Sequence, residues 1–185
     1  MRILGIDPGY ATVGFGILDY NGKAFSLIAF GTITTDLELG FSKRLLTIYR
    51  DISDLIMRYT PTYVSIEKLF FNTNHTTGID VAQARGVILL AAEQCGVKIY
   101  EYTPLQVKSS IAGYGRAEKR QVQEMVRQIL GLKENPKPDD AADALALAVT
   151  HGHYSASAAF SEYSKQAYES GDYQKFRNSK KGGRG

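Results

Sequence analysis

Residues 3–20 read ILGIDPGYATVGFGILDY, and this stretch decides the fold because one strand enters a tight turn and a second strand leaves it. Apolar residues precede Asp7, whereas Pro8 and Gly9 follow it and favour a turn. A turn alone does not explain a carboxylate at the end of a strand that enters the interior. Asp7 is therefore either an ordinary turn residue or a group that holds something positively charged.

The composition of the 185-residue chain predicts one globular domain with a sizeable core. The sequence contains no uncharged apolar run of the length needed to span a membrane and no pattern of a secretory signal. The single cysteine, Cys95, falls in an apolar helical run, so we expect a buried thiol in a reduced, cytoplasmic protein.

The net charge of +3 originates in the C-terminal part of the chain. Residues 1–150 contain 16 basic and 16 acidic side chains, whereas the last 35 residues contain six basic and three acidic ones. Residues 98–127 also have a local basic excess, which fits either a polyanionic partner or an ordinary solvated helix face. We expect residues 154–185 to form a basic, disordered tail behind a domain of residues 1–153.

Hydrophobic periodicity predicts an α/β fold in which a five-stranded mixed sheet carries helices on both faces. Asn21-Gly22 is a hairpin signal, so the first three strands should form an antiparallel meander. The expected strands are 2–7, 13–20, 24–35, 62–67 and 97–102, and the expected helices are 42–59, 78–94, one starting at Thr103-Pro104, 117–130 and 139–153.

Four carboxylates stand at the ends of these predicted elements. Asp7 and Glu67 end two strands, and Asp140 and Asp143 lie three residues apart in the first turn of the last helix. Each has an ordinary alternative, since acids favour helix N-termini and strand ends are often exposed. Together, however, four carboxylates repel one another unless a cation lies between them. Ligands that are all oxygen favour Mg²⁺ or Mn²⁺.

Six segments of residues 1–153 resemble, in order and spacing, the RuvC family of Holliday junction resolvases. They are GIDPG, IEKLFF, AQARG, YTPLQVK, GRAEKRQVQEMV and DDAADALALAVTH. The resemblance implies a ribonuclease H-like fold and a homodimer that uses Mg²⁺ to nick two opposed strands of a four-way DNA junction in recombination and repair. It also implies a partner complex for branch migration, of the RuvA and RuvB type.

The resemblance also assigns residues. It makes Asp7, Glu67, Asp140 and Asp143 the catalytic, metal-binding acids, although Asp139 is adjacent to Asp140 and could replace it. We expect two divalent ions per site, with Asp7 between them, and the glycines beside Asp7 should keep the site open to a DNA backbone. The residues expected to contact DNA are Phe70 or its neighbour Phe71, which would stack on bases, and Arg85, Lys108 and Lys119, which would contact phosphates.

The apolar character of one predicted helix indicates a dimer. Residues 79–92 are apolar on nearly every side of that helix, which predicts cover by the sheet on one face and by a second copy on another.

Two alternative functions remain open. A GIDxG-like strand also opens actin-like and sugar-kinase-like phosphotransferases, which are about twice as long. The other alternative is a protein of the same fold that binds junctions without cutting them.

Overall fold

The computed structural model describes residues 1–68 and 75–157, without the side chains of residues 75–77. The chain divides into two compact units, Met1–Gly152 and His153–Gly185, and the first contains the whole sheet. Its strands are β1 (Arg2–Asp7), β2 (Thr12–Tyr20), β3 (Phe25–Thr34), β4 (Tyr63–Glu67) and β5 (Lys98–Tyr102). The helices are α1 (Phe41–Tyr59), α2 (His75–Gln94), α3 (Pro104–Ala112), α4 (Lys119–Ile129) and α5 (Asp139–Ala156).

The strands form one mixed sheet in the order β3-β2-β1-β4-β5. β1, β2 and β3 pair antiparallel, as the hairpin signal predicts, and β1, β4 and β5 run parallel. In the turn between β2 and β3, the side chain of Asn21 accepts hydrogen bonds from the backbone N–H groups of Lys23 and Ala24, each at 2.9 Å. Gly22 has a φ of 95°, which glycine adopts without strain. The predicted meander is thus confirmed.

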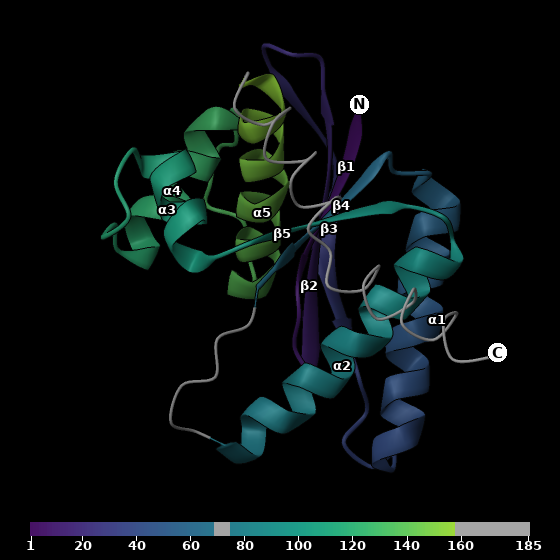
Figure 1. The fold of residues 1–185 in the computed structure, drawn as a ribbon. Helices are drawn as coiled ribbons and strands as arrows, with labels where there is room; N and C mark the ends of the chain where they lie inside the picture. Colours follow the sequence, from purple (N-terminus) through teal and green to yellow (C-terminus); the bar gives the residue numbers. More distant parts are fainter. Residues whose placement is uncertain (69–74, 158–185) are drawn as a thin grey trace, which may run out of the picture. The chain divides into compact units, whose positions relative to one another are not determined.

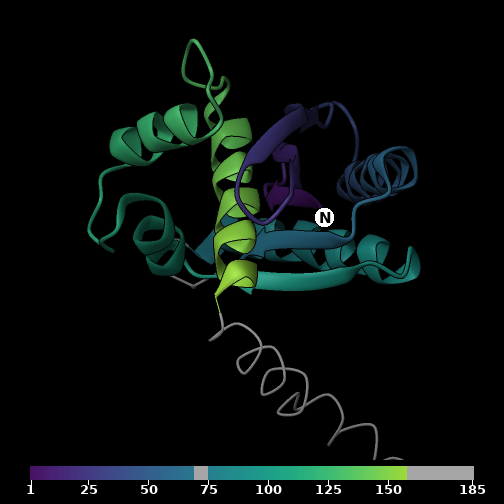
Figure 2. The ribbon, with the colours of Figure 1, turned by 90° about the horizontal axis from the view of Figure 1, so that it is seen from above.

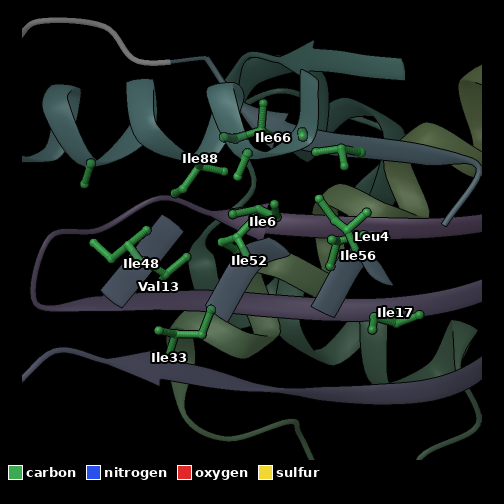
Figure 3. Packing of buried hydrophobic residues seen from close by; sticks show 14 residues of the cluster. Leu4, Ile6, Val13, Ile17, Ile33, Ile48, Ile52, Ile56, Ile66 and Ile88 are labelled. Atoms are coloured by element: carbon green, nitrogen blue, oxygen red, sulfur yellow. The ribbon is translucent and has the colours of Figure 1, made fainter. Parts of the chain in front are cut away.

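Helices cover both faces of the sheet (Figures 1 and 2). Because successive side chains of a strand point to opposite faces, Leu4 and Ile6 of β1 point one way and Ile3 the other. Leu4 and Ile6 belong to a core with α1 and α2, where Ile48, Ile52 and Ile88 pack against the strands (Figure 3). Ile3 instead belongs to a second core with α3, α4 and α5.

Helix α5 lies directly against the sheet because glycines on β1 and β2 leave room for it. A Cβ atom on Gly5 would lie 2.0 Å from the carbonyl oxygen of Ala144, and one on Gly16 would meet the side chain of Leu145 at 2.7 Å. The hydroxyl of Ser65 on β4 also donates a hydrogen bond to the carbonyl oxygen of Leu147, at 2.7 Å. These contacts fix both the height and the direction of α5 above the strands.

Two sequence-based expectations are wrong. Cys95 is exposed, because α2 ends at Gln94 and the helical periodicity that would bury the thiol stops there. The glycines beside Asp7 do not clear a path for DNA, because α5 fills the space at Gly5 and the carbonyl oxygen of Thr12 fills that at Gly9. Helix α2 also begins three residues earlier than predicted. None of the helices in the described segments is long and apolar enough to cross a membrane.

Candidate metal-binding site

Asp7 and Glu67 lie on the same face of the sheet, at the ends of neighbouring parallel strands. The pairing of β1 with β4 runs from Ile3–Tyr63 to Ile6–Ile66, so the two acids follow directly after the last pair. Gly5 and Ser65, two residues before them, both contact α5. Since side chains two residues apart share a face, both carboxylates are presented on the side of the sheet that α5 covers.

The first turn of α5 lies over the same strand ends. Gly14 of β2 pairs with Asp7, and a Cβ atom on Gly14 would lie 2.0 Å from the carbonyl oxygen of Asp140. Asp143 lies one turn further along α5, on the same side of the helix as Asp140. The close contact at Gly14 therefore brings the N-terminus of α5, with its two acids, beside Asp7.

The electrostatics of the four acids show that their side chains interact. Burial raises the pKa of Asp7 to about 7, and the negative charges of Asp143, Glu67 and Asp140 contribute to the rise. Burial and the charge of Asp143 raise the pKa of Glu67, and the pKa of Asp143 is raised mainly by burial. Each raised pKa means that the ionised carboxylate is disfavoured in this place and would be stabilised by a cation.

Lys119, the first residue of α4, supplies a positive charge to this site. Its ammonium nitrogen lies 2.8 Å from Oδ2 of Asp143 and 3.3 Å from Oδ2 of Asp139. The lysine lowers the pKa of Asp7, Glu67 and Asp143, and so opposes the effect of burial. It thereby connects α4 to the acidic end of α5.

The structure separates Asp139 from Asp140, which the sequence leaves as alternatives. Asp139 is exposed and accepts a hydrogen bond from Nε2 of Gln123 at 3.1 Å, in addition to its ion pair with Lys119. These two contacts lower the pKa of Asp139, whereas Asp140 is half-buried and raises the pKa of Asp7. Asp139 thus faces α4, and Asp140 belongs electrostatically with Asp7.

These carboxylates have the chemistry of a site for hard divalent cations, because oxygen donors are what Mg²⁺ and Mn²⁺ prefer. Across residues 1–68 and 78–157, no three His, Cys, Asp or Glu side chains already form a set that could hold a metal ion. Asp143 is instead paired with Lys119. A divalent ion would therefore have to draw the four side chains together.

The residues predicted to contact DNA lie in different surroundings. Lys108 lies half-buried on α3, which packs beside α4, and Lys119 adjoins the acids. Arg85 on α2 is engaged within the protein, by the backbone carbonyl of Glu67 and the carboxylate of Glu101. Phe70 and Phe71 lie outside the described residues, so the stacking role remains a prediction.

Sequence reasoning missed two contributors to this site. Gln123 holds Asp139, and the four-residue spacing from Lys119 on one helix is a signal that could have identified it. Gly14 and Gly16 admit α5, and alternating glycines within a strand indicate that another backbone comes close. Gln123 orients one side chain of the site, whereas the two glycines determine how close the whole of α5 lies to the sheet.

Comparison with known proteins identifies the family. The family model of crossover junction endodeoxyribonuclease RuvC matches residues 3–151. The crossover junction endodeoxyribonuclease RuvC of Caldanaerobacter subterraneus subsp. tengcongensis is 54% identical over 153 residues, which span 83% of this chain and 93% of that relative. A second relative of the same description, from Brevibacillus brevis, is 53% identical over 162 residues, spanning 88% of this chain and 98% of its own.

Solved structures agree with the sequence comparisons. The structure of Thermus thermophilus RuvC superposes with a TM-score of 0.79 at 38% identity, covering 84% of this chain and 95% of its own. A structure of the same protein in complex with a Holliday junction substrate has a TM-score of 0.77 at 35% identity, with the same coverage. The ribonuclease H-like expectation for the sheet is thereby confirmed. The chain belongs to the RuvC family of crossover junction endodeoxyribonucleases.

Proposed function

We propose that this protein is a metal-dependent endonuclease that resolves four-way DNA junctions by nicking two opposed strands. The observation that carries the proposal is the placement of Asp7, Glu67, Asp140 and Asp143 where the first turn of α5 lies over the ends of β1 and β4. Membership of the RuvC family supports the substrate, since the Thermus thermophilus relative is known in complex with a Holliday junction. Cleavage of the phosphodiester backbone is the chemistry that such a carboxylate cluster serves.

The four acids would hold two Mg²⁺ ions, or Mn²⁺ in their place. Bound divalent ions supply an activated water and charge stabilisation for phosphodiester hydrolysis. Asp7 would serve both ions, because its strand lies between β4, which carries Glu67, and β2, whose Gly14 contacts Asp140. Lys119 keeps a positive charge beside the carboxylates, where it would attract a backbone phosphate, and Lys108 would contact the same strand from α3.

A homodimer would supply the second active site that paired nicking requires. The outward side of α2 supports this arrangement, because the apolar side chains of Ile79 and Leu90 are exposed on it. Gly86 lies between them with open space in front of it, so the backbone of a second copy could approach closely. We further propose that residues 1–153 are the nuclease domain and 154–185 a basic tail, and that a motor complex of the RuvA and RuvB type acts with the protein.

A synthetic four-way junction, incubated with and without Mg²⁺, tests this function. Wild-type protein should make paired, symmetric nicks with ligatable ends, and only when Mg²⁺ is present. Asp7→Asn should reduce cleavage by at least about a hundredfold while leaving junction binding intact, because it removes a metal ligand and not a DNA contact.

Four outcomes would contradict the proposal. Near-normal cleavage by Asp7→Asn would exclude the proposed site. Junction binding by the wild type without any Mg²⁺-dependent nicking would favour a non-catalytic binding protein. Equal cutting of plain duplex would remove the specificity for junctions, and ATP turnover without DNA would favour the phosphotransferase alternative.

A further inference from the structure

We infer that Arg85 and Glu101 form a clamp that positions Glu67 for metal binding, and that Arg85 is not a DNA contact. The inference rests on the proposed metal-dependent function and assigns a role within the same site. It concerns a positioning residue, because Arg85 reaches the backbone of Glu67 and not its carboxylate. The clamp joins three elements, α2, β4 and β5.

The clamp consists of two contacts made by one guanidinium. Nε of Arg85 donates a hydrogen bond to the backbone carbonyl oxygen of Glu67 at 3.1 Å. Nη2 of Arg85 forms an ion pair with Oε1 of Glu101. An arginine can do this because its planar, forked donors serve two acceptors at once, which the single ammonium of a lysine cannot match.

The place of the clamp explains why β4 needs it. The pairing of β1 with β4 ends at Ile6–Ile66, one residue before Glu67, so β1 no longer supports the strand there. On the other side, the pairing with β5 continues through Glu67–Tyr102, and the backbone N–H of Lys68 donates to the carbonyl oxygen of Tyr102 at 2.9 Å. Arg85 therefore holds the strand end to α2 at the residue that carries the metal-binding carboxylate.

The environment of Arg85 argues against a phosphate contact. Its side chain is only 16% exposed, compared with 54% for the side chain of Lys119. A phosphate would have to compete with the carboxylate of Glu101 for a guanidinium that is already largely covered.

Substitution of Arg85 or Glu101 distinguishes a role in positioning Glu67 from a role in binding DNA. Arg85→Met and Glu101→Gln should each raise the Mg²⁺ or Mn²⁺ concentration for half-maximal binding by about tenfold, as loss of an outer-shell partner typically does. Metal binding to the DNA-free protein is measured by calorimetry and by thermal stabilisation, and junction binding is measured separately in EDTA. Junction affinity should stay within about twofold of wild type, and the double variant should be no worse than the singles.

A DNA contact predicts the opposite pattern. In that case Arg85→Met would weaken junction binding in EDTA, and Glu101→Gln would strengthen it by removing a negative charge near a phosphate contact. That result, or unchanged metal binding in both variants, would overturn the inference. Should Arg85→Met fail to fold, Glu101→Gln still decides, because the Glu101 side chain is 42% exposed.

Two controls complete the design. Glu93→Gln removes a charge from the exposed surface of α2, so it should change neither metal nor junction binding. Wild-type protein that binds no divalent metal and cuts no junction would contradict the proposed function itself. Wild-type protein that does both, beside unaffected Arg85 and Glu101 variants, would contradict the clamp alone.

Discussion

Gly14 and Asp140 touch through their backbones: a Cβ atom on Gly14 would lie 2.0 Å from the carbonyl oxygen of Asp140. Gly14 is also the residue that pairs with Asp7 across the β1–β2 ladder. One contact therefore sets the separation between the strand that carries the first acid and the helix that carries two others. The proposed metal site therefore depends on a residue that contributes no side chain to it.

Gly14→Ala tests this contact. The added methyl group cannot be accommodated by a side-chain movement because it meets backbone, so α5 must move away. We expect a loss of about 3 kcal/mol or more in the free energy of unfolding, measured by urea denaturation, together with weaker metal binding. Gly40→Ala is the matched control, since Gly40 also has open space around it and an ordinary φ of −61° at the N-cap of α1, and it should cost no more than about 1 kcal/mol. Equal effects of the two substitutions would contradict the prediction.

Asp7→Asn should stabilise the metal-free protein at high pH. The pKa of Asp7 is about 7 in the folded protein against an ordinary value of 3.8, so the folded state binds the proton more tightly. The ionised carboxylate therefore destabilises the fold increasingly as the pH rises from about 4 to 7, by up to about 4 kcal/mol at about 1.4 kcal/mol per pKa unit. Asparagine removes this cost. Urea denaturation in EDTA should show the gain at pH 8 and almost none at pH 4, whereas a variant less stable than wild type at pH 8 would refute it.

Lys119→Met should move the acidic limb of metal binding to higher pH. Lys119 lowers the pKa of Asp7, Glu67 and Asp143, so without it these groups deprotonate only at higher pH. Titration of Mg²⁺ binding at a series of pH values measures the shift. Arg120→Gln removes the neighbouring exposed cation, which pairs with none of the four acids, and should leave the pH profile in place. A shift of the same size in both variants would mean that only the general charge of α4 matters.

His151 should make the protein less stable in mild acid. Its side chain is buried, its Nδ1 lies 2.8 Å from the hydroxyl of Tyr102, and burial lowers its pKa from 6.5 to about 4. The unfolded chain therefore takes up the proton first, and stability is lost as the pH falls from about 6.5 towards 4, by up to about 3 kcal/mol.

This slope is opposite in sign to that of Asp7, so the two partly cancel in the wild type. In an Asp7→Asn background, urea denaturation at pH 7, 6, 5 and 4.5 should show that the free energy of unfolding decreases as the pH is lowered. Adding His151→Asn should flatten that dependence, even though the smaller side chain lowers stability at every pH. A slope that persists in the double variant would assign it to other groups.

Much of the architecture follows from local sequence patterns. Alternating apolar residues predict the strands, and Asn21-Gly22 predicts the hairpin, because both depend on neighbours along the chain. Thr103-Pro104 predicts the start of α3, where the side chain of Thr103 and that of Gln106 form a reciprocal cap. Cys95 is predicted incorrectly even though the predicted helix end at residue 94 is right, because a residue just beyond a helix end is placed by the following turn and not by the helical period.

The sequence by itself determined which acids could form a site, since the ends of strands and helices are readable from their patterns. Only the tertiary structure decided how these acids are placed relative to one another and to the basic residues. Asp139 and Asp140 are indistinguishable along the chain, but α4 engages Asp139 through Lys119 and Gln123 while Asp140 lies with Asp7. Likewise, nothing along the chain distinguishes Arg85 from the other cations. In the folded protein it contacts Glu67 and Glu101, which are distant from it in the sequence. Charges act through space, and the packing of α5 and α2 on the sheet sets those distances.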